Sequence, residues 1–552
     1  MKNILFTTLF VLGAVFNNAT AQSKDDKQLT AAIDKLLSEQ FKTNETGGAA
    51  LVARNGEIVY KKAFGMANLE LNIPMQADNV FRIGSITKQF TAVAILQLME
   101  QGKLSLQDDI MKFIPDYPRD GHKITIEHLL THTSGIKSYT SMKDFGDIMR
   151  KDMKPEELIN HFKNQPMDFA PGTKWRYNNS GYFLLGYIIE KVSGKTYPQY
   201  LGDVFFKPLG MTNSYYGSDS KIIKNRASAY GKTDKGFENA EPLSMTLPYS
   251  AGSIQSTVED LFKWHQAVHA YKLVKKESLD KAFTAYKLTD GKATTYGYGW
   301  AFGNIQGSET IEHGGGINGF LTMGIYLPKE DVFVAVFSNC GCNSPDEVSS
   351  KIAALTIGKP YEYKEIKMDN ALLESYTGVY EKDGSDELRI ISFTDNQLYS
   401  QRGRNTKFKV KPYQKDMFFF ENAVTTLEFS KNGAEKIDKL IVKGRQGNET
   451  WNKTNKPIPT IVEIQVADNI LEKYVGDYEL ASNFILSITK EKNQLFAQAT
   501  GQGKNELFAE TETKFFLKVV AAQIEFFKDD AGKVTKLVLN QGGAKMDAPK
   551  IK

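Results

Sequence analysis

The sequence predicts an α/β (α+β) domain, built from an antiparallel sheet flanked by helices, followed by two small all-β barrel domains. Three observations lead to this prediction. A helix that is apolar nearly all round begins just after residue 85 and is flanked in sequence by strand-like segments. Beyond about residue 360 the chain changes to many short alternating runs with few helix signals. These runs then recur once, at a nearly constant interval.

The length and charge of the chain fit this organisation. A chain of 552 residues has room for about three domains of ~150 residues each. We place an export signal at 1–21, the α/β domain at 22–360, and the two barrels at 361–460 and 461–552. The formal charge of +4 comes from 69 basic and 65 acidic residues that are well mixed along the chain. This mixture gives no basic arm, so we expect no nucleic-acid partner.

The N-terminal stretch has the pattern of an export signal. Lys2 is followed by an apolar run over 4–16 and by small residues at 19–21, which predicts cleavage near Ala21. The run is too short to span a bilayer, and no later segment is long and apolar enough. Gln22, rather than a cysteine, follows the expected cleavage site, which argues against a lipid anchor. We therefore expect an exported protein, periplasmic or secreted, without a membrane span.

The first elements of the predicted α/β domain are a helix and a hairpin. Residues 27–41 have the apolar stripe of an amphipathic helix. Two strand-like runs, 48–54 and 57–61, flank Asn55-Gly56, a pair typical of a type I′ turn. A helix and an antiparallel hairpin ahead of a buried helix favour a sheet covered by helices.

Ser85 and Lys88 stand at the start of the buried helix. Residues three apart on a helix lie on the same face, one turn apart. A hydroxyl is a poor nucleophile until a neighbour takes its proton, and a desolvated lysine can help to do so. The same spacing recurs at Ser487 and Lys490, but in a strand-like run, where such residues point to opposite faces. Ser85 is therefore the candidate nucleophile and Lys88 its activating partner.

Two pairs of potential metal ligands are predicted to be structural. His128 and His132 lie four apart, but Leu129 occupies the position that glutamate takes in the zinc motif H-E-x-x-H, so a structural or orienting role is expected. Cys340 and Cys342, the two cysteines of the chain, are too close in sequence to bridge easily. We expect them to pack at a strand end, without a disulfide and without a metal.

Three further segments of the domain carry candidate polar side chains or indicate that another group lies close to the backbone. Tyr177 and Asn179 are expected in a loop before an apolar helix at 183–192, where side chains can point into a cleft. Residues 251–261 indicate a glycine turn that enters a capped helix. In the strand run after 311, three consecutive glycines follow His313 and mark a close approach to the backbone. A phosphate-binding loop competes with this interpretation, but no lysine–serine/threonine pair or following helix supports it.

The region after residue 360 contains an internal repeat. Leu373 and Tyr376 recur 98 residues later as Leu471 and Tyr474. The segment 396–401 recurs 97 residues later, and so do two shorter pairs further along. This interval indicates two copies of one all-β module, each the size of a small up-and-down barrel.

The order Ser85-x-x-Lys88, Tyr177-x-Asn179 and His313-Gly314-Gly315 resembles the serine β-lactamase and penicillin-binding protein family. The resemblance is to its class C-like branch, which includes D-alanyl-D-alanine carboxypeptidases, esterases and D-aminopeptidases. It covers roughly 31–338 and includes accessory stretches at 126–136, 208–211 and 297–300.

The resemblance implies a mechanism and a set of roles. Ser85 would form an acyl-enzyme, and Lys88 and Tyr177 would share the base role, with the phenol partly ionised by the nearby ammonium. Asn179 would hold the lysine and the substrate. The backbone N–H groups of Ser85 and Gly316 would form the oxyanion hole. His313, Gly315 and Gly316 are thus expected to contact substrate, and neither a metal nor an organic cofactor is implied.

His313 is a departure from the lysine that usually begins the third motif. The permanent cation that grips a substrate carboxylate is then missing at neutral pH, unless the pKa of this histidine is raised. Members of the family with histidine here include esterases and D-aminopeptidases, and the latter carry two C-terminal β-barrels. The resemblance therefore implies hydrolysis of amide or peptide bonds in small-molecule or short-peptide substrates that contain D-amino acids.

Two alternatives remain open at this point. A carboxylesterase, acyltransferase or β-lactamase would use the same site with a different leaving group. A non-catalytic, penicillin-binding-like scaffold or binding protein is the other alternative. It ranks last because Ser85, Lys88 and Tyr177 are all present.

Overall fold

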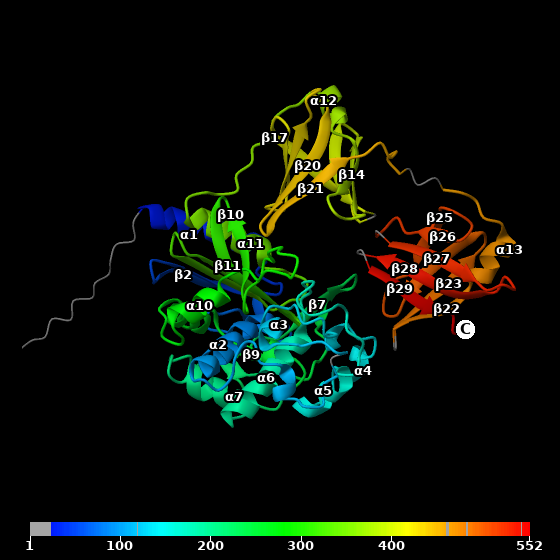
Figure 1. The fold of residues 1–552 in the computed structure, drawn as a ribbon. Helices are drawn as coiled ribbons and strands as arrows, with labels where there is room; N and C mark the ends of the chain where they lie inside the picture. Colours follow the sequence, from blue (N-terminus) through cyan, green and yellow to red (C-terminus); the bar gives the residue numbers. More distant parts are fainter. Residues whose placement is uncertain are drawn as a thin grey trace, which may run out of the picture.

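The computed structural model describes residues 24–118, 120–403, 405–459, 463–481, 484–520, 522–541 and 544–552. The predicted export signal at 1–21 lies outside these residues. Figure 1 shows an α/β domain followed by two β-barrels. The predicted fold class is therefore confirmed. The expected boundary near 360 falls between helices α11 (Asp346–Thr356) and α12 (Asn370–Ser375).

The centre of the α/β domain is a six-stranded antiparallel sheet in the order β10-β11-β12-β13-β1-β2. Its strands are β1 (Gly48–Arg54), β2 (Glu57–Phe64), β10 (Ala301–Ile305), β11 (Ser308–Ile317), β12 (Phe320–Leu327) and β13 (Val332–Ser338). Asn55 and Gly56 join β1 to β2 with φ of 53° and 75°. A type I′ turn requires positive φ at both positions, so the predicted hairpin is confirmed.

Helices cover both faces of the sheet, and alternate residues of β13 show this division. Val334 and Val336 pack with α1 (Lys24–Gln40) and α11 on one side. Phe333, Ala335 and Phe337 face the larger core on the other side. Successive residues of a strand point to opposite faces, so a central strand between two helical layers must be apolar throughout. All seven residues of β13 are buried.

The predicted buried helix is α2 (Thr87–Glu100), which lies in the larger core. A one-turn 3-10 helix, η1 (Gly84–Ile86), leads into it. Eleven of its fourteen residues are buried, which explains why the helix is apolar nearly all round. Phe90 stacks on Trp264 of α9 (Val258–His269), with ring centroids 3.8 Å apart. As expected for 251–261, α9 is capped, by the Thr257 side chain.

The remaining elements of this domain surround the sheet and α2. The helices are η2 (Ile110–Lys112), α3 (Ile126–Leu130), η3 (Tyr139–Ser141), α4 (Phe145–Ile148), α5 (Pro155–Phe162), α6 (Asn179–Ser193), α7 (Tyr197–Tyr200), η4 (Leu201–Phe206), α8 (Tyr249–Gly252) and α10 (Lys276–Ala282). The short strands are β3 (Met66–Asn68), β4 (Ile73–Pro74), β5 (Phe81–Arg82), β6 (Tyr215–Tyr216), β7 (Tyr230–Thr233), β8 (Gly236–Asn239) and β9 (Ile254–Ser256).

Each C-terminal module is an eight-stranded up-and-down barrel. The first contains β14 (Gly378–Lys382), β15 (Leu388–Thr394), β16 (Gln397–Arg402), β17 (Phe408–Gln414), β18 (Met417–Phe420), β19 (Thr426–Lys431), β20 (Ile437–Gly444) and β21 (Gly447–Lys453). It closes by pairing β14 with β21. After α13 (Asp468–Leu471) and η5 (Glu472–Tyr474), the second contains β22 (Gly476–Ala481), β23 (Phe484–Glu491), β24 (Gln494–Ala499), β25 (Asn505–Ala509), β26 (Lys514–Phe516), β27 (Ala522–Lys528), β28 (Val534–Gln541) and β29 (Ala544–Pro549). Backbone hydrogen bonds join Asp477 at its start to Ile551 and Lys552 at its end.

The two barrels repeat the same internal hydrogen bonds. The Tyr380 hydroxyl donates to the Tyr376 carbonyl at 2.7 Å, and Tyr478 donates to Tyr474 at 2.8 Å. Gln397 and Gln494 each donate across to the next strand, to Val410 and Leu507. The repeat predicted from sequence is therefore one module present twice.

The cysteine prediction was wrong. Cys340 and Cys342 form a disulfide in the turn after β13, where their Cα atoms lie 5.0 Å apart. That separation is within the usual range for a bridge, which the short sequence spacing had led us to doubt.

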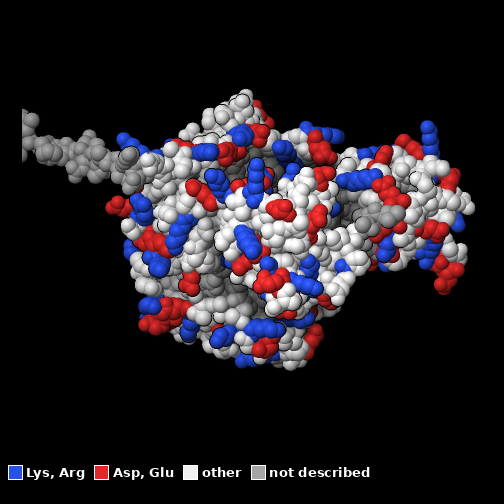
Figure 2. Space-filling model, turned by 90° about the horizontal axis from the view of Figure 1, so that it is seen from above, with Lys and Arg blue, Asp and Glu red and all other residues white. Residues whose placement is uncertain are grey.

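Two further predictions concern the surface and the membrane. Figure 2 shows Lys and Arg interspersed with Asp and Glu over the visible face, in keeping with the mixed charge of the sequence. Among the described residues, no helix has the length and apolar character needed to cross a membrane.

Candidate active site

Ser85 and Lys88 come from η1 and the first turn of α2. The Lys88 Nζ atom lies 3.1 Å from the Ser85 Oγ atom. The predicted placement on one face of the helix is therefore confirmed. Ser85 is half-buried, whereas the Lys88 side chain is completely buried. Ser85 is thus partly accessible to solvent, whereas the Lys88 amine is not.

Tyr177 and Asn179 complete a hydrogen-bonded cluster around this pair. Asn179 Oδ1 accepts a hydrogen bond from Lys88 Nζ at 2.9 Å, and the Tyr177 hydroxyl is hydrogen bonded to Ser85. Lys88 Nζ also lies 4.7 Å from the centroid of the Tyr177 ring. The structure thus brings four of the predicted site residues into one network.

The helix after Tyr177 starts earlier than predicted. We expected it at 183, but α6 begins at Asn179, because the Asn178 side chain caps it by accepting from the Gly181 N–H. Asn179 therefore stands in the first turn of a helix and not in a loop. Its Nδ2 atom donates to Thr140 Oγ1 at 3.1 Å, which fixes the amide with its oxygen toward Lys88.

Sequence reasoning missed the third partner of Lys88. The Ala251 carbonyl oxygen, in α8, accepts from Lys88 Nζ at 2.9 Å. A backbone carbonyl gives no signal in residue identity, so only the fold could place it there.

Burial opposes the charged forms of both Lys88 and Tyr177. Desolvation holds the pKa of Lys88 well below its ordinary value. It raises the pKa of Tyr177, and the hydrogen bond to Ser85 only partly opposes this rise. The partly ionised phenol expected from the resemblance is therefore not supported. Burial thus disfavours both the ammonium form of Lys88 and the phenolate form of Tyr177.

The glycines of β11 allow it to lie against the serine turn. A Cβ atom on Gly315 would lie 2.0 Å from the Ile83 carbonyl oxygen, and one on Gly84 would lie 2.9 Å from the Gly316 nitrogen. The predicted close approach to the backbone is thus confirmed. Gly316 is exposed, which suits the predicted role of its N–H in an oxyanion hole with that of Ser85. That role stays a prediction.

His313 is buried and neutral beside this glycine segment. Its Nδ1 atom lies 2.6 Å from the Gly314 carbonyl oxygen, which can only accept, so Nδ1 carries the proton. Its Nε2 atom then accepts from the Tyr296 hydroxyl at 2.8 Å. Desolvation, with a smaller effect of the nearby Lys88 charge, lowers the pKa of His313 to about 3. The upward shift that could have supplied a cation here does not occur.

The other two histidines of interest pack within the domain. His128 belongs to the capping box of α3 with Thr125. His132 is buried between the rings of Tyr177 and Tyr296, with centroids 4.4 and 4.6 Å away, and accepts from the Asn178 N–H. His132 therefore supports the ring of Tyr177, which is the orienting role expected. No cluster of three or more metal-ligating side chains occurs in the described residues.

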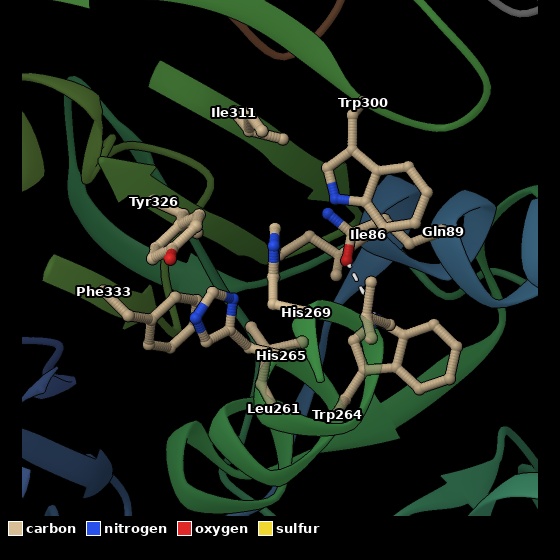
Figure 3. A pocket seen from close by; sticks show the side chains of 12 residues that line it. Ile86, Gln89, Leu261, Trp264, His265, His269, Trp300, Ile311, Tyr326 and Phe333 are labelled. Carbon is tan, nitrogen blue, oxygen red and sulfur yellow. Dashed lines mark hydrogen bonds between the residues drawn. The ribbon is translucent and has the colours of Figure 1, made fainter. Parts of the chain in front are cut away.

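A pocket of about 260 Å³ opens beside Tyr177 and His313. A separate cavity, drawn in Figure 3, lies among α9, β11–β13 and the inner face of α2. There Trp264 donates to Gln89, and His265 and His269 point into the space. This cavity has about 20 Å³, room for roughly one water molecule. Ser85 lines neither space, but Tyr177, which is hydrogen bonded to Ser85, lines the larger one. The candidate active site is therefore the region around Ser85.

Two segments of the chain match known protein families, and the first of these segments contains the site around Ser85. Residues 29–357, more than half of the chain, match the Beta-lactamase family. Residues 462–549 match a domain of unknown function, DUF3471. This second match covers the second barrel.

Individual proteins of several kinds resemble the chain. It is 25% identical to a penicillin-binding protein of Bacillus subtilis (strain 168), over 94% of this chain and 99% of that protein. It is 34% identical to the penicillin-binding protein PbpX of the same organism, over 61% of this chain and 82% of that protein. It is 32% identical to esterase EstB of Burkholderia gladioli, over 42% of this chain and 58% of the esterase.

Solved structures of penicillin-binding protein and amidohydrolase relatives are also similar to this chain. A penicillin-binding protein homologue from Pyrococcus abyssi, described as octameric, aligns with a TM-score of 0.54 at 27% identity, covering 77% of this chain and 99% of that one. A D-stereospecific amidohydrolase from Streptomyces aligns with a TM-score of 0.52 at 26% identity, covering 59% of this chain and 98% of that one. With its fold, its motifs and these matches, the chain belongs to the β-lactamase family of serine hydrolases.

Proposed function

We propose that this protein is an exported serine hydrolase that forms an acyl-enzyme on Ser85. Its substrates are small molecules or short peptides containing D-amino acids, cleaved at an amide or peptide bond. The observation that supports this most strongly is the position of Lys88 Nζ, held between Ser85 Oγ, Asn179 Oδ1 and the Ala251 carbonyl.

Acylation follows from the positions of these groups. The Ser85 oxygen attacks the substrate carbonyl carbon while its proton passes to the Lys88 amine. The N–H groups of Ser85 and Gly316 stabilise the negative oxygen of the tetrahedral intermediate. As the carbon–nitrogen bond breaks, the Tyr177 hydroxyl protonates the leaving amine and regains a proton from the Lys88 ammonium. Lys88 then ends the step neutral, with the acyl group on Ser85.

Deacylation repeats the same transfers with water. A water molecule that takes the place of the departed amine gives a proton to Lys88, through Tyr177, as its oxygen attacks the acyl carbon. Ser85 Oγ leaves and receives the proton back from Lys88. The products are the acid and the free enzyme, and every proton is returned.

The neutral state of His313 supports the choice of substrate. A lysine in this position would offer a fixed charge to a substrate carboxylate, whereas buried neutral imidazole offers none. Substrates without a carboxylate near the reacting bond therefore fit better than β-lactams. The similarity to a D-stereospecific amidohydrolase supports amide substrates of D configuration.

A carboxylesterase is the second candidate, supported by the 32% identity to esterase EstB. It would use the same acyl-enzyme and differ only in the leaving group. A non-catalytic scaffold remains the weakest alternative, because the reactive groups are not only present but hydrogen bonded to one another.

A labelling experiment tests the nucleophile. A fluorophosphonate should label the purified mature protein, with the label on Ser85 by peptide mapping, and Ser85→Ala should abolish it. A panel of p-nitrophenyl esters, D- and L-aminoacyl anilides and nitrocefin then decides the reaction class, with faster turnover expected for D-aminoacyl anilides than for nitrocefin. Labelling that survives unchanged in Ser85→Ala would refute the assignment. N-terminal sequencing of the exported form should start at Gln22.

A further inference from the structure

The turn between β20 and β21 of the first barrel contacts the α/β domain next to the candidate active site. Figure 1 shows this end of the barrel directed toward the α/β domain. The turn carries Arg445 and Gln446, between Gly444 and Gly447. These residues are 132 and 133 positions from His313 in the chain, so only the fold brings them together.

Arg445 makes side-chain and backbone contacts with the α/β domain. Its guanidinium forms an ion pair with Glu312 and donates to Ser350 Oγ. Its carbonyl oxygen accepts from the Asn304 N–H at 2.7 Å. A Cβ atom on Gly303 would lie only 3.0 Å from that oxygen, so the turn sits directly on the backbone of β10.

The Arg445–Glu312 pair is desolvated. The side chains are 14% and 2% exposed, and Thr310 donates a further hydrogen bond to Glu312. Glu312 immediately precedes His313 on β11. Removal of the arginine would leave a buried carboxylate without its counter-charge, so Glu312 would have to move or take up a proton. Arg445 thereby fixes the part of β11 that carries His313 and the glycines facing Ser85.

The same turn forms one wall of the 260 Å³ pocket beside the reactive groups. The α/β domain supplies Tyr177 and His313 to this pocket, and the barrel supplies Arg445 and Gln446. Half of the remaining lining is aromatic or apolar, contributed by Trp175, Tyr296, Ala301 and Met323, and the other half consists of Thr295, Glu312, Gly314 and Asp346. The Glu312 carboxylate is paired with Arg445. Trp175 is 39% exposed, a large apolar surface at a pocket that is also lined by Tyr177, the hydrogen-bond partner of Ser85.

We propose that this interdomain pocket binds the part of the substrate next to the reacting carbonyl, and that it takes a bulky apolar or aromatic group. In this arrangement Gln446 is a specificity-determining residue and Arg445 is a positioning residue that acts through Glu312 and β11. The first barrel is thus part of the active site. The inference rests on the proposed function, since it requires an acyl-enzyme on Ser85.

The pocket is tested with two fluorophosphonates that differ only in one substituent, methyl or benzyl, so that the result does not depend on the leaving group of the natural substrate. Gln446→Trp places an indole in the pocket. We expect the second-order labelling rate of Ser85 to fall ~10-fold or more for the benzyl probe, the scale of discrimination by a filled apolar pocket, with little change for the methyl probe. Gln446→Ala should preserve or increase the preference for benzyl.

Arg445→Ala tests the positioning role. We expect the limiting labelling rate to fall ~10-fold or more for both probes, while the concentration for half-saturation changes little, because the loss affects the reacting groups and not the pocket. Arg445→Lys should recover part of the rate, since it keeps the positive charge. Arg402→Ala, an arginine in an exposed ion pair with Glu387 on the same barrel, is the matched control and should behave as wild type.

The possible results separate the two proposals. The role of the interdomain pocket would be overturned if Gln446→Trp slowed the labelling of both probes equally. It would also be overturned if folded Arg445→Ala kept the wild-type limiting rate. In both cases Ser85 would remain the nucleophile. Failure of wild type to label at Ser85 would instead overturn the proposed function and this inference together.

Discussion

Lys88 Nζ lies 3.1 Å from Ser85 Oγ, and its two other hydrogen bonds go to oxygens that can only accept. Lys88 Nζ donates to all three oxygens, which matches the three hydrogens of an ammonium. When the amine has lost one proton, the two oxygens that can only accept keep its remaining hydrogens. Its lone pair then faces the Ser85 hydroxyl, in the orientation that accepts the serine proton.

The first prediction concerns pH. Because burial lowers the pKa of Lys88, the base form should be present well below pH 10.5, the ordinary value for lysine. Acylation should rise with pH through this lowered pKa and then level off. The measurement is the second-order rate constant for fluorophosphonate labelling between pH 5 and pH 10. A rate constant that still rises about tenfold per pH unit at pH 10, without levelling off, would contradict a desolvated lysine base.

The second prediction concerns shared proton transfer. Lys88→Ala and Tyr177→Phe should each slow acylation by ~10²-fold or more, the usual contribution of general acid–base assistance. The double variant should lose far less than the product of the two, because the residues act as a unit. Tyr182→Phe removes a nearby hydroxyl that donates to the Leu130 carbonyl, and it serves as the control. Full activity in Tyr177→Phe would remove this residue from the mechanism.

The third prediction concerns charge selectivity. His313→Lys should increase acylation by benzylpenicillin relative to an uncharged p-nitrophenyl ester, because a lysine can form a charge-assisted hydrogen bond with the penicillin carboxylate. The ratio of the two second-order rate constants is compared between wild type and variant. If wild type already prefers the penicillin, or the ratio does not rise, β-lactamase becomes the leading assignment.

The fourth prediction uses two adjacent glycines. Gly315→Ala should lower the melting temperature and abolish labelling, because its Cβ would lie 2.0 Å from the Ile83 carbonyl oxygen, on the segment that leads to Ser85. Gly314→Ala is the matched control, since its Cβ would make only ordinary van der Waals contacts, with the Met323 sulfur at 3.4 Å and the Thr322 carbonyl oxygen at 3.5 Å. Melting curves and labelling of the two variants should differ sharply. Equal tolerance of both would mean that β11 and the serine turn are not held together as described.

Local rules were enough to predict several elements from sequence. Asn55-Gly56 predicted a hairpin because few residues adopt two successive positive φ angles. Ser85 and Lys88 were predicted to share a face because helical spacing is fixed. The barrels followed from a repeat interval, which requires no knowledge of contacts.

Other features depend on tertiary structure and could not be predicted in the same way. The Ala251 carbonyl beside Lys88 is a backbone atom brought in by a distant helix. The contact of Arg445 with Glu312 joins two domains, and nothing near either residue indicates the other. The start of α6 at Asn179 depended on which of two adjacent asparagines caps the helix. The ionisation of Tyr177 depended on burial, which a motif does not report.

The duplicated tyrosine hydrogen bonds of the barrels also bear on how the chain evolved. Tyr376–Tyr380 and Tyr474–Tyr478 show that both copies have retained the interior of the ancestral module. At the repeat interval of 97, Arg445 and Gln446 of the first copy correspond to Gly542 and Gly543 of the second. The two copies therefore share their internal hydrogen bonds but not the arginine that pairs with Glu312. They are alike in what holds each barrel together and differ in a residue that joins a barrel to the α/β domain.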